Sequence, residues 1–215
     1  VGFGRVPFHS DEAILGLMAR HILHAGARPI FYYGQAYMGS LDAYLIAGGF
    51  AAFGEQVWVI RLVTALVYAG FLLSLYALVN QLFANERVTI ITVWLAAVPT
   101  ALVLTYTTAT LGGYVEVMLF GYLILLFGVR VLSNQGGGID WLLLGLFSGL
   151  GLWTLGLAGL YVLPVGLLGL GQFRVARMRG YTLAALGLVL GMLPWWLHNV
   201  EHDWAALAAL TGPDA

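Results

Sequence analysis

Two adjacent carboxylates, Asp11 and Glu12, are the residues of this chain that are best suited to chemistry. Only 9% of the residues are charged, yet two acids stand together at the head of a short amphipathic segment. A carboxylate at a water–membrane boundary can act as a general base toward a hydroxyl or an amine, while its neighbour orients a partner or an arginine. Helical neighbours point about 100° apart, so we expect separate roles for the two acids. The alternative is that both only satisfy a helix N-terminus.

Two further charged residues lie near the ends of long apolar stretches. Arg61 stands one turn into such a stretch, and a charge inside a membrane helix is usually paired or functional. We expect it to hold a phosphate or one of the acidic residues, in preference to reaching lipid headgroups. Glu116 opens a later apolar stretch and is expected either to pair with Arg61 or to bind an acceptor, with a purely structural ion pair as the alternative.

Three residues complete the candidate substrate-binding set: Tyr33, Arg28 and His198. Arg28 ranks below Arg61, because exposed interfacial arginines commonly meet lipid headgroups. His198 and His202 are four residues apart, a spacing compatible with a metal, but the pattern of a zinc protease is absent and a structural role is preferred. Whether a metal is bound is therefore unknown from the sequence.

The elements that must position these residues belong to an integral membrane protein. Hydrophobic residues make up 61% of the chain and the mean hydropathy is +0.91, far from the balance of soluble domains. Backbone in lipid must satisfy its own hydrogen bonds, and no period-two alternation indicates a barrel, so the fold class is all-α, a polytopic helix bundle. The spacings Gly145 to Gly149 and Gly187 to Gly191 favour close helix packing.

The apolar stretches predict a transmembrane bundle of about six spanning helices over residues 57–215, and the whole chain is expected to form a single domain. They are expected near Val57–Phe83, Val88–Tyr106, Tyr114–Leu132, Asp140–Leu157, Leu160–Phe173 and Tyr181–Leu197. The fourth and fifth fill one uncharged stretch that glycines and Pro164 interrupt, which predicts broken or tilted helices or a re-entrant hairpin.

Residues 1–56 differ from the rest and are expected to form the first extracytoplasmic loop, with two interfacial helices. Ser10 is the expected N-cap of the first, which Gly26 and Pro29 end. Residues 30–40 are rich in tyrosine and glycine and are predicted to be a loop, followed by a short helix over residues 41–53.

Basic residues fix the expected orientation, since arginine near membrane ends favours the cytoplasm. Arg87, Arg130 and the group Arg174, Arg177 and Arg179 fall in alternate loops, which therefore share the cytoplasmic side. Eight of the ten acidic residues lie on or near the other side, which predicts an active site facing outside, in a bacterial plasma membrane. The net charge of −1 makes nucleic acid an improbable partner, and the lack of cysteine excludes thiolate metal sites.

An ordered series of short motifs resembles the GT-C membrane glycosyltransferases, and within them the branch of the protein O-mannosyltransferases and lipid A aminoarabinose transferases. The motifs are His9-Ser10-Asp11-Glu12-Ala13, Gly26-Ala27-Arg28-Pro29, Phe31-Tyr32-Tyr33-Gly34-Gln35, Phe53-Gly54 and Arg61-Leu62. The resemblance implies that Asp11 is the catalytic base, that Glu12 supports it, and that the donor is a sugar on a polyprenyl phosphate. It also implies further spans on either side, so we expect the chain to be a fragment truncated at both ends.

The predicted function is thus an inverting transfer of a sugar from a polyprenyl-phosphate donor to a lipid, glycan or protein acceptor. Either Arg61 or a divalent ion held by Glu12 or Glu116 is expected to meet the charge of the departing phosphate. Two other classes compete with this interpretation. One is a transporter or flippase component that uses Asp11, Arg61 and Glu116 as a pathway, and the other is an inactive fragment that acts as a membrane scaffold.

Overall fold

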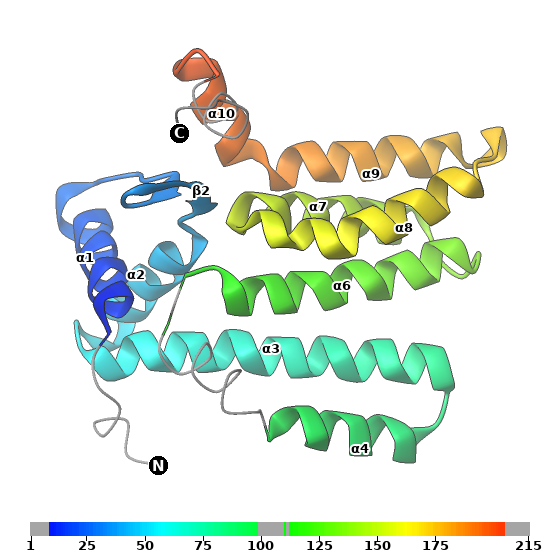
Figure 1. Cartoon of the computed structure of the whole chain (residues 1–215), viewed down its shortest axis with the longest axis horizontal. Helices are drawn as coiled ribbons and strands as arrows, with labels where there is room; N and C mark the ends of the chain where they lie inside the picture. The colour runs from blue at the N-terminus through cyan, green and yellow to red at the C-terminus, as the bar shows by residue number, and fades with distance from the viewer. Residues whose placement is uncertain (1–8, 99–109, 111, 205–215) are drawn as a thin grey trace.

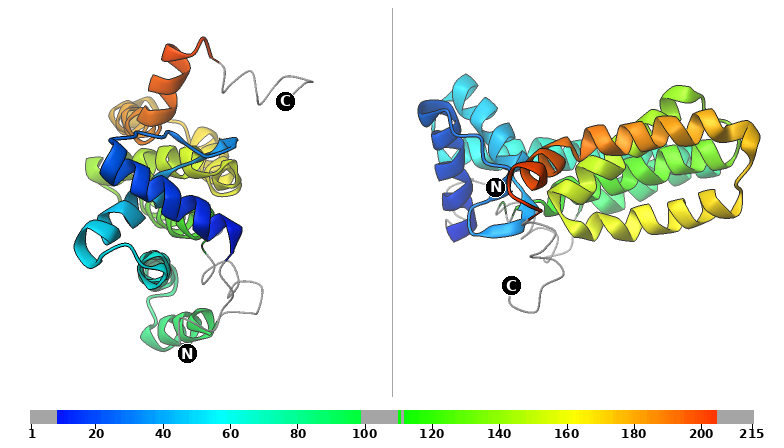
Figure 2. Two further views of the ribbon diagram at one scale, coloured as in Figure 1. Left: turned by 90° about the vertical axis from the view of Figure 1, so that its left-hand side faces the viewer. Right: turned by 90° about the horizontal axis from the view of Figure 1, so that it is seen from above.

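A computed structural model describes residues 9–98, 110 and 112–204, which form a bundle of helices capped at one end by shorter elements (Figure 1). The longer helices run side by side, and the N-terminal helices and a small hairpin lie across one end of them (Figures 1 and 2). The helices are α1 (Ser10–Ala25), α2 (Leu41–Phe53), α3 (Val57–Phe83), α4 (Glu86–Ala97), α6 (Tyr114–Leu132), α7 (Gly138–Thr154), α8 (Gly159–Gly171), α9 (Met178–Gly191) and α10 (Leu193–Glu201). The predicted all-α class is confirmed.

Two of the described helices, α3 and α6, are each long and apolar enough to cross a membrane. The segment Val175–Gly191 passes the same test together with Leu193–Glu201, although the two parts are bent by 62°. The sequence predicts one helix over residues 181–197, whereas the chain breaks after Gly191 and restarts with Pro194 in the first turn of α10, where a proline needs no hydrogen-bond partner for its nitrogen. The remaining apolar helices are shorter, and the number of spans stays a prediction.

Close packing of α7 on α9 depends on the glycines that the sequence singled out. A Cβ atom on Gly145 would overlap the carbonyl oxygen of Ala184, and one on Gly149 would overlap that of Leu188. From the other side, a Cβ on Gly187 would meet the backbone of Leu142. Backbone contact of this kind needs residues without side chains, so these glycines are required by the helix interface.

The break between α7 and α8 agrees with the predicted interruption. The short 3-10 helix η1 (Gly156–Ala158) joins them, and Figure 1 shows α8 returning along the bundle beside α7. At the far end of the bundle a second 3-10 helix, η2 (Val175–Arg177), joins α8 to α9. The connections α3–α4, α6–α7 and α8–α9 lie together at this end, opposite α1 and α2 (Figure 1), and Arg87 in the first turn of α4, Arg130 in the last turn of α6 and Arg174 just before η2 stand next to them.

Residues 30–40 are not the predicted loop, because a two-stranded antiparallel hairpin forms there. Strand β1 (Phe31–Tyr32) pairs with β2 (Gln35–Gly39), and Met38 continues the pairing to Leu155. The indole Nε1 of Trp153 donates a hydrogen bond to the carbonyl oxygen of Ile30, at 3.1 Å. The hairpin is therefore held against the end of α7 by contacts that join residues more than a hundred positions apart.

The helix predicted over residues 88–106 begins two residues earlier, as α4, and its last part lies outside the described residues. Thr105, Thr107 and Thr108, whose hydroxyls could contact a sugar, also lie outside the described residues. Thr110 is described and buried, and its hydroxyl contacts the hydroxyl of Thr64 on α3.

Candidate functional site

The N-terminus of α1 is closed by a capping box that uses Glu12. The N-cap is His9 rather than the predicted Ser10, which is instead the first residue of the helix. The imidazole Nδ1 of His9 accepts a hydrogen bond from the backbone N–H of Asp11 at 3.3 Å. The carboxylate of Glu12 accepts one from the backbone N–H of His9 at 3.0 Å. The glutamate at the third helical position therefore sets where the helix begins.

Glu12 also forms a buried ion pair with Arg61 of α3. The guanidinium Nε lies 2.8 Å from Oε1 of Glu12, and Nη2 lies 3.1 Å from Oε2. The side chain of Glu12 is 0% exposed and that of Arg61 is 3% exposed. The sequence leaves two roles to Arg61, to hold a phosphate or to hold an acidic residue. In the structure Arg61 holds an acidic residue, Glu12. This two-point contact joins the first loop to the first long helix and fixes both side chains.

Asp11, the neighbour of Glu12 on α1, is more exposed to solvent than Glu12. Its side chain is 32% exposed, and its Oδ1 accepts a long hydrogen bond of 3.4 Å from the hydroxyl of Tyr32. Burial raises the pKa of Tyr32, and the nearby carboxylate of Asp11 raises it further, so the hydroxyl stays protonated and donates. His9 lies on the other side, with Nδ1 3.4 Å from Oδ2. Asp11 is thus the accessible acid of the pair.

Asp42 and Glu116 are two buried acids close enough to interact electrostatically. Burial raises the pKa of Asp42 to about 7, against the lowering effect of backbone N–H groups such as that of Ala43, which donates to its Oδ1 at 2.8 Å. Its Oδ2 has no hydrogen-bond partner among the residues that the structure describes. The sequence analysis counts Asp42 only among the eight acidic residues on the outer side.

Glu116 does not form the ion pair with Arg61 that the sequence offers as one option. It is 4% exposed, in the first turn of α6, and within the described ranges it has no cationic partner. Tyr32 lies within electrostatic reach of both Asp11 and Asp42. The tyrosine is therefore close to the accessible acid Asp11 and to the buried acid Asp42.

The other predicted residues lie at the same end of the molecule without a shown contact to Asp11. The hydroxyl of Tyr33 is 3.1 Å from Nδ1 of His21, and the ring of His198 packs edge-on against Phe31, with 4.9 Å between ring centroids. Arg28 is exposed and forms no ion pair with another described residue, whereas Arg20 pairs with Glu55 at 2.8 Å. His198 stacks on His202, and no group of three or more metal-ligating side chains is found in the described part of the chain.

The apolar helices indicate an integral membrane protein, and acidic residues gather at the end of the bundle where α1 lies. The sequence model of the dolichyl-phosphate-mannose-protein mannosyltransferase family matches residues 38–198, and the chain belongs to this family. The predicted family is confirmed, and it makes the chain a glycosyltransferase of the mannosyltransferase type. The match begins after α1, so that Asp11 and Glu12 precede it. Neither a curated protein nor a solved structure gives a significant match.

Proposed function

We propose that the chain forms the catalytic part of a transferase that moves a sugar from a polyprenyl-phosphate donor to a lipid, glycan or protein acceptor on the outer face of the membrane. The observation that carries the proposal is that two neighbouring acids have different environments. Both carboxylate oxygens of Glu12 are bound, by the backbone N–H of His9 in the capping box and by the guanidinium of Arg61. Asp11 accepts no backbone hydrogen bond from any residue that the structure describes, and it keeps about a third of its side chain exposed. It is therefore available as a base.

In the proposed reaction Asp11 takes the proton of the acceptor hydroxyl or amine. The acceptor atom forms a bond to the anomeric carbon while the bond from that carbon to the phosphate oxygen breaks. The electron pair leaves with the polyprenyl phosphate, and the configuration at the anomeric carbon is inverted. The hydroxyl of Tyr32 holds the carboxylate of Asp11 in place. Their hydrogen bond is long, but hydrogen bonds at catalytic groups are often long before substrate binds and shorten afterwards.

The charge of the departing phosphate needs a partner, and Arg61 is already neutralised by Glu12. Arg28 follows α1 at the same end of the molecule and is exposed. We assign it the role of meeting the phosphate, since a guanidinium binds two phosphate oxygens at once. A divalent ion is the other option that the sequence left open.

The donor's hydrocarbon chain fits a cavity of about 640 Å³ that is lined by α2, the outer half of α3, α6 and one residue of α7. Every lining residue is apolar or glycine, including Leu45, Phe53, Leu66 and Phe120. Leu62 and Val63 follow Arg61 directly along α3, so this cavity begins just below the buried ion pair. An isoprenoid chain placed here leaves its phosphate near the outer end of the bundle.

The function is tested with the complete protein reconstituted in vesicles and supplied with a polyprenyl phosphate that carries radiolabelled mannose. We expect label to move to the acceptor fraction and the product to have the inverted configuration. Addition of EDTA separates the two options for the phosphate, since activity that survives EDTA favours Arg28. If no donor sugar is consumed with any of the three acceptor classes, the proposed function is wrong.

The orientation is tested by labelling single cysteines, for which the chain is suited because it contains none. Tyr37 on the hairpin is 57% exposed, and Val175 in η2 at the other end is 78% exposed. We expect a membrane-impermeant maleimide to label Tyr37→Cys in intact cells and Val175→Cys only after permeabilisation. The unsubstituted protein serves as the blank. The reverse pattern would place Asp11 in the cytoplasm.

A further inference from the structure

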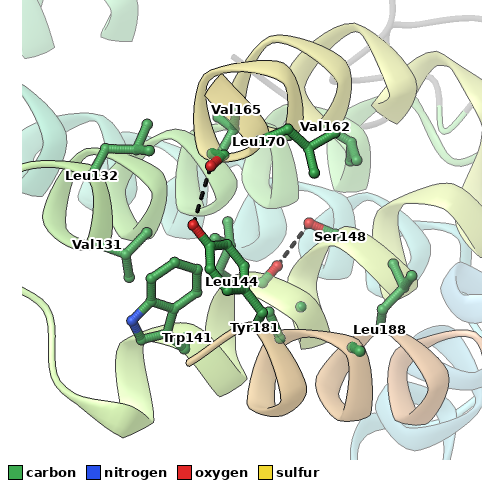
Figure 3. Close-up of a pocket in the computed structure, with 15 residues that line it drawn as sticks. Val131, Leu132, Trp141, Leu144, Ser148, Val162, Val165, Leu170, Tyr181 and Leu188 are labelled. Carbon is green, nitrogen blue, oxygen red and sulfur yellow. Dashed lines mark hydrogen bonds between the residues drawn. The ribbon is translucent and has the colours of Figure 1, made fainter. Parts of the chain in front are cut away.

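A second cavity lies in the half of the bundle that is farthest from Asp11. It has a volume of about 270 Å³ and is enclosed by α6, α7, α8 and α9 (Figure 3). Apolar side chains point into it from all four helices, among them Val131, Leu144, Val165 and Leu188 (Figure 3). An engineered apolar cavity of about 150 Å³ is already large enough to bind benzene, so this one has room for a hydrocarbon chain segment.

The two hydroxyl groups on the cavity wall already form hydrogen bonds within the protein. The hydroxyl of Ser148 donates to the carbonyl oxygen of Leu144 at 2.7 Å, and the hydroxyl of Tyr181 donates to that of Gly169 at 3.1 Å (Figure 3). A sugar or a phosphate would lose its own hydrogen bonds here without gaining others. The interior therefore suits a purely apolar occupant.

Glycines on α8 leave the cavity open. A Cβ atom on Gly166 or on Gly169 would have no atom within 4 Å, although both residues line the cavity. In contrast, a Cβ on Gly128 of α6 would lie 2.8 Å from Val165, as expected where a glycine serves close packing. Packing against the neighbouring helices thus does not explain Gly166 and Gly169.

Three arginines without a carboxylate partner among the described residues lie in and beside η2, the connection from α8 to α9. Leu170 and Tyr181 line the cavity, and Arg174, Arg177 and Arg179 lie between them in sequence. Within the described residues none of the three arginines forms an ion pair, whereas nearby Arg130 is neutralised by Asp140 at 3.0 Å. The side chain of Arg177 donates to Asn134, but its Nη1 is buried and finds no partner in the described part of the chain.

We propose that this cavity binds one acyl chain of an anionic phospholipid whose phosphate lies on Arg174, Arg177 and Arg179. The apolar cavity selects the hydrocarbon, and the three arginines select the negative headgroup at the same end. Trp141 and Tyr181, in edge-on contact with 5.0 Å between their ring centroids, lie where a chain meets its headgroup, as aromatic residues commonly do at membrane interfaces. The site is separate from the proposed catalytic end and does not depend on the proposed function.

The test measures binding of phosphatidylglycerol and of phosphatidylcholine with the same acyl chains to the complete protein, by native mass spectrometry and by the shift in thermal unfolding. We expect phosphatidylglycerol to bind and to raise the unfolding temperature. Phosphatidylcholine should bind at least tenfold more weakly, because its neutral headgroup loses the attraction of roughly one or two arginines. Inorganic phosphate should neither replace the lipid nor displace it. Equal binding of the two lipids would overturn the proposal.

Two pairs of variants locate the site. Gly166→Leu fills the cavity, and Gly159→Leu is its control, because Gly159 is on the same helix and equally open but does not line the cavity. Arg174→Gln with Arg177→Gln removes two of the three positive charges, and Arg87→Gln is the control at the same end of the bundle. We expect roughly a tenfold loss of lipid binding in the first member of each pair alone. Arg174 is exposed and Arg177 is half-buried, and neither forms an ion pair with another described residue, so the arginine variants decide the question even if Gly166→Leu does not fold. Unchanged binding in them would contradict the proposal.

Discussion

Replacement of Asp11 by asparagine is expected to lower sugar transfer by about 10²- to 10⁴-fold, the usual contribution of a general base. The substitution keeps the shape of the side chain and removes its ability to take a proton. It should leave the fold intact, because the capping box uses His9 and Glu12 and not the carboxylate of Asp11. The measurement is the single-turnover rate of transfer from the labelled donor, together with the thermal unfolding temperature of the variant.

The matched control for this variant is Glu55→Gln. Glu55 is also an acid at the outer end, with the same side-chain exposure of 32%, and it is bound by Arg20 and His24. It should retain most of the wild-type rate. Tyr32→Phe should give a smaller loss than Asp11→Asn, because it removes only the hydrogen bond that positions the carboxylate and leaves the base itself in place. An Asp11→Asn protein that keeps most of its rate would remove Asp11 from the mechanism.

The long helices were predictable because a membrane leaves the backbone few choices. The sequence predicts residues 57–83 and 114–132 as helices, and α3 and α6 have these same bounds. The hairpin at Phe31–Gly39 was missed because β1 has only two residues, and its strands carry no alternating pattern of their own. Contacts with Trp153 and Leu155 stabilise it, and such tertiary contacts cannot be read from local sequence.

The sequence proposes candidate site residues but does not determine which of them pair with one another. Asp11 and Glu12 could be singled out as neighbours with separate roles, since helix geometry sends their side chains in different directions. The partner of Arg61 could not be chosen between Glu12 and Glu116, because 49 residues separate Arg61 from the acid that it meets. Asp42 was passed over because burial, which gives it an unusual pKa, is a property of the folded chain.

Replacement of Arg61 by leucine is expected to cost about 3–5 kcal/mol of stability, because it leaves the carboxylate of Glu12 buried and without its counter-charge. Thermal or denaturant unfolding in detergent measures the loss. The exposed pair of Arg20 and Glu55 is the control, and Arg20→Gln should cost no more than about 1 kcal/mol because solvent screens that pair.

A double variant decides whether Arg61 acts through Glu12 or on the donor. Replacing Arg61 and Glu12 together by leucine removes both charges, so we expect it to recover part of the stability that Arg61→Leu alone loses. The recovery is incomplete, since His9 also loses the acceptor for its backbone N–H. If Arg61 instead held the donor phosphate, Arg61→Leu would raise the KM for the donor with little change in unfolding temperature. The ion pair joins α1 to α3, so a structural role for Arg61 predicts a different result. In Arg61→Leu the first loop would be held less firmly on α3, and activity and unfolding temperature would fall together.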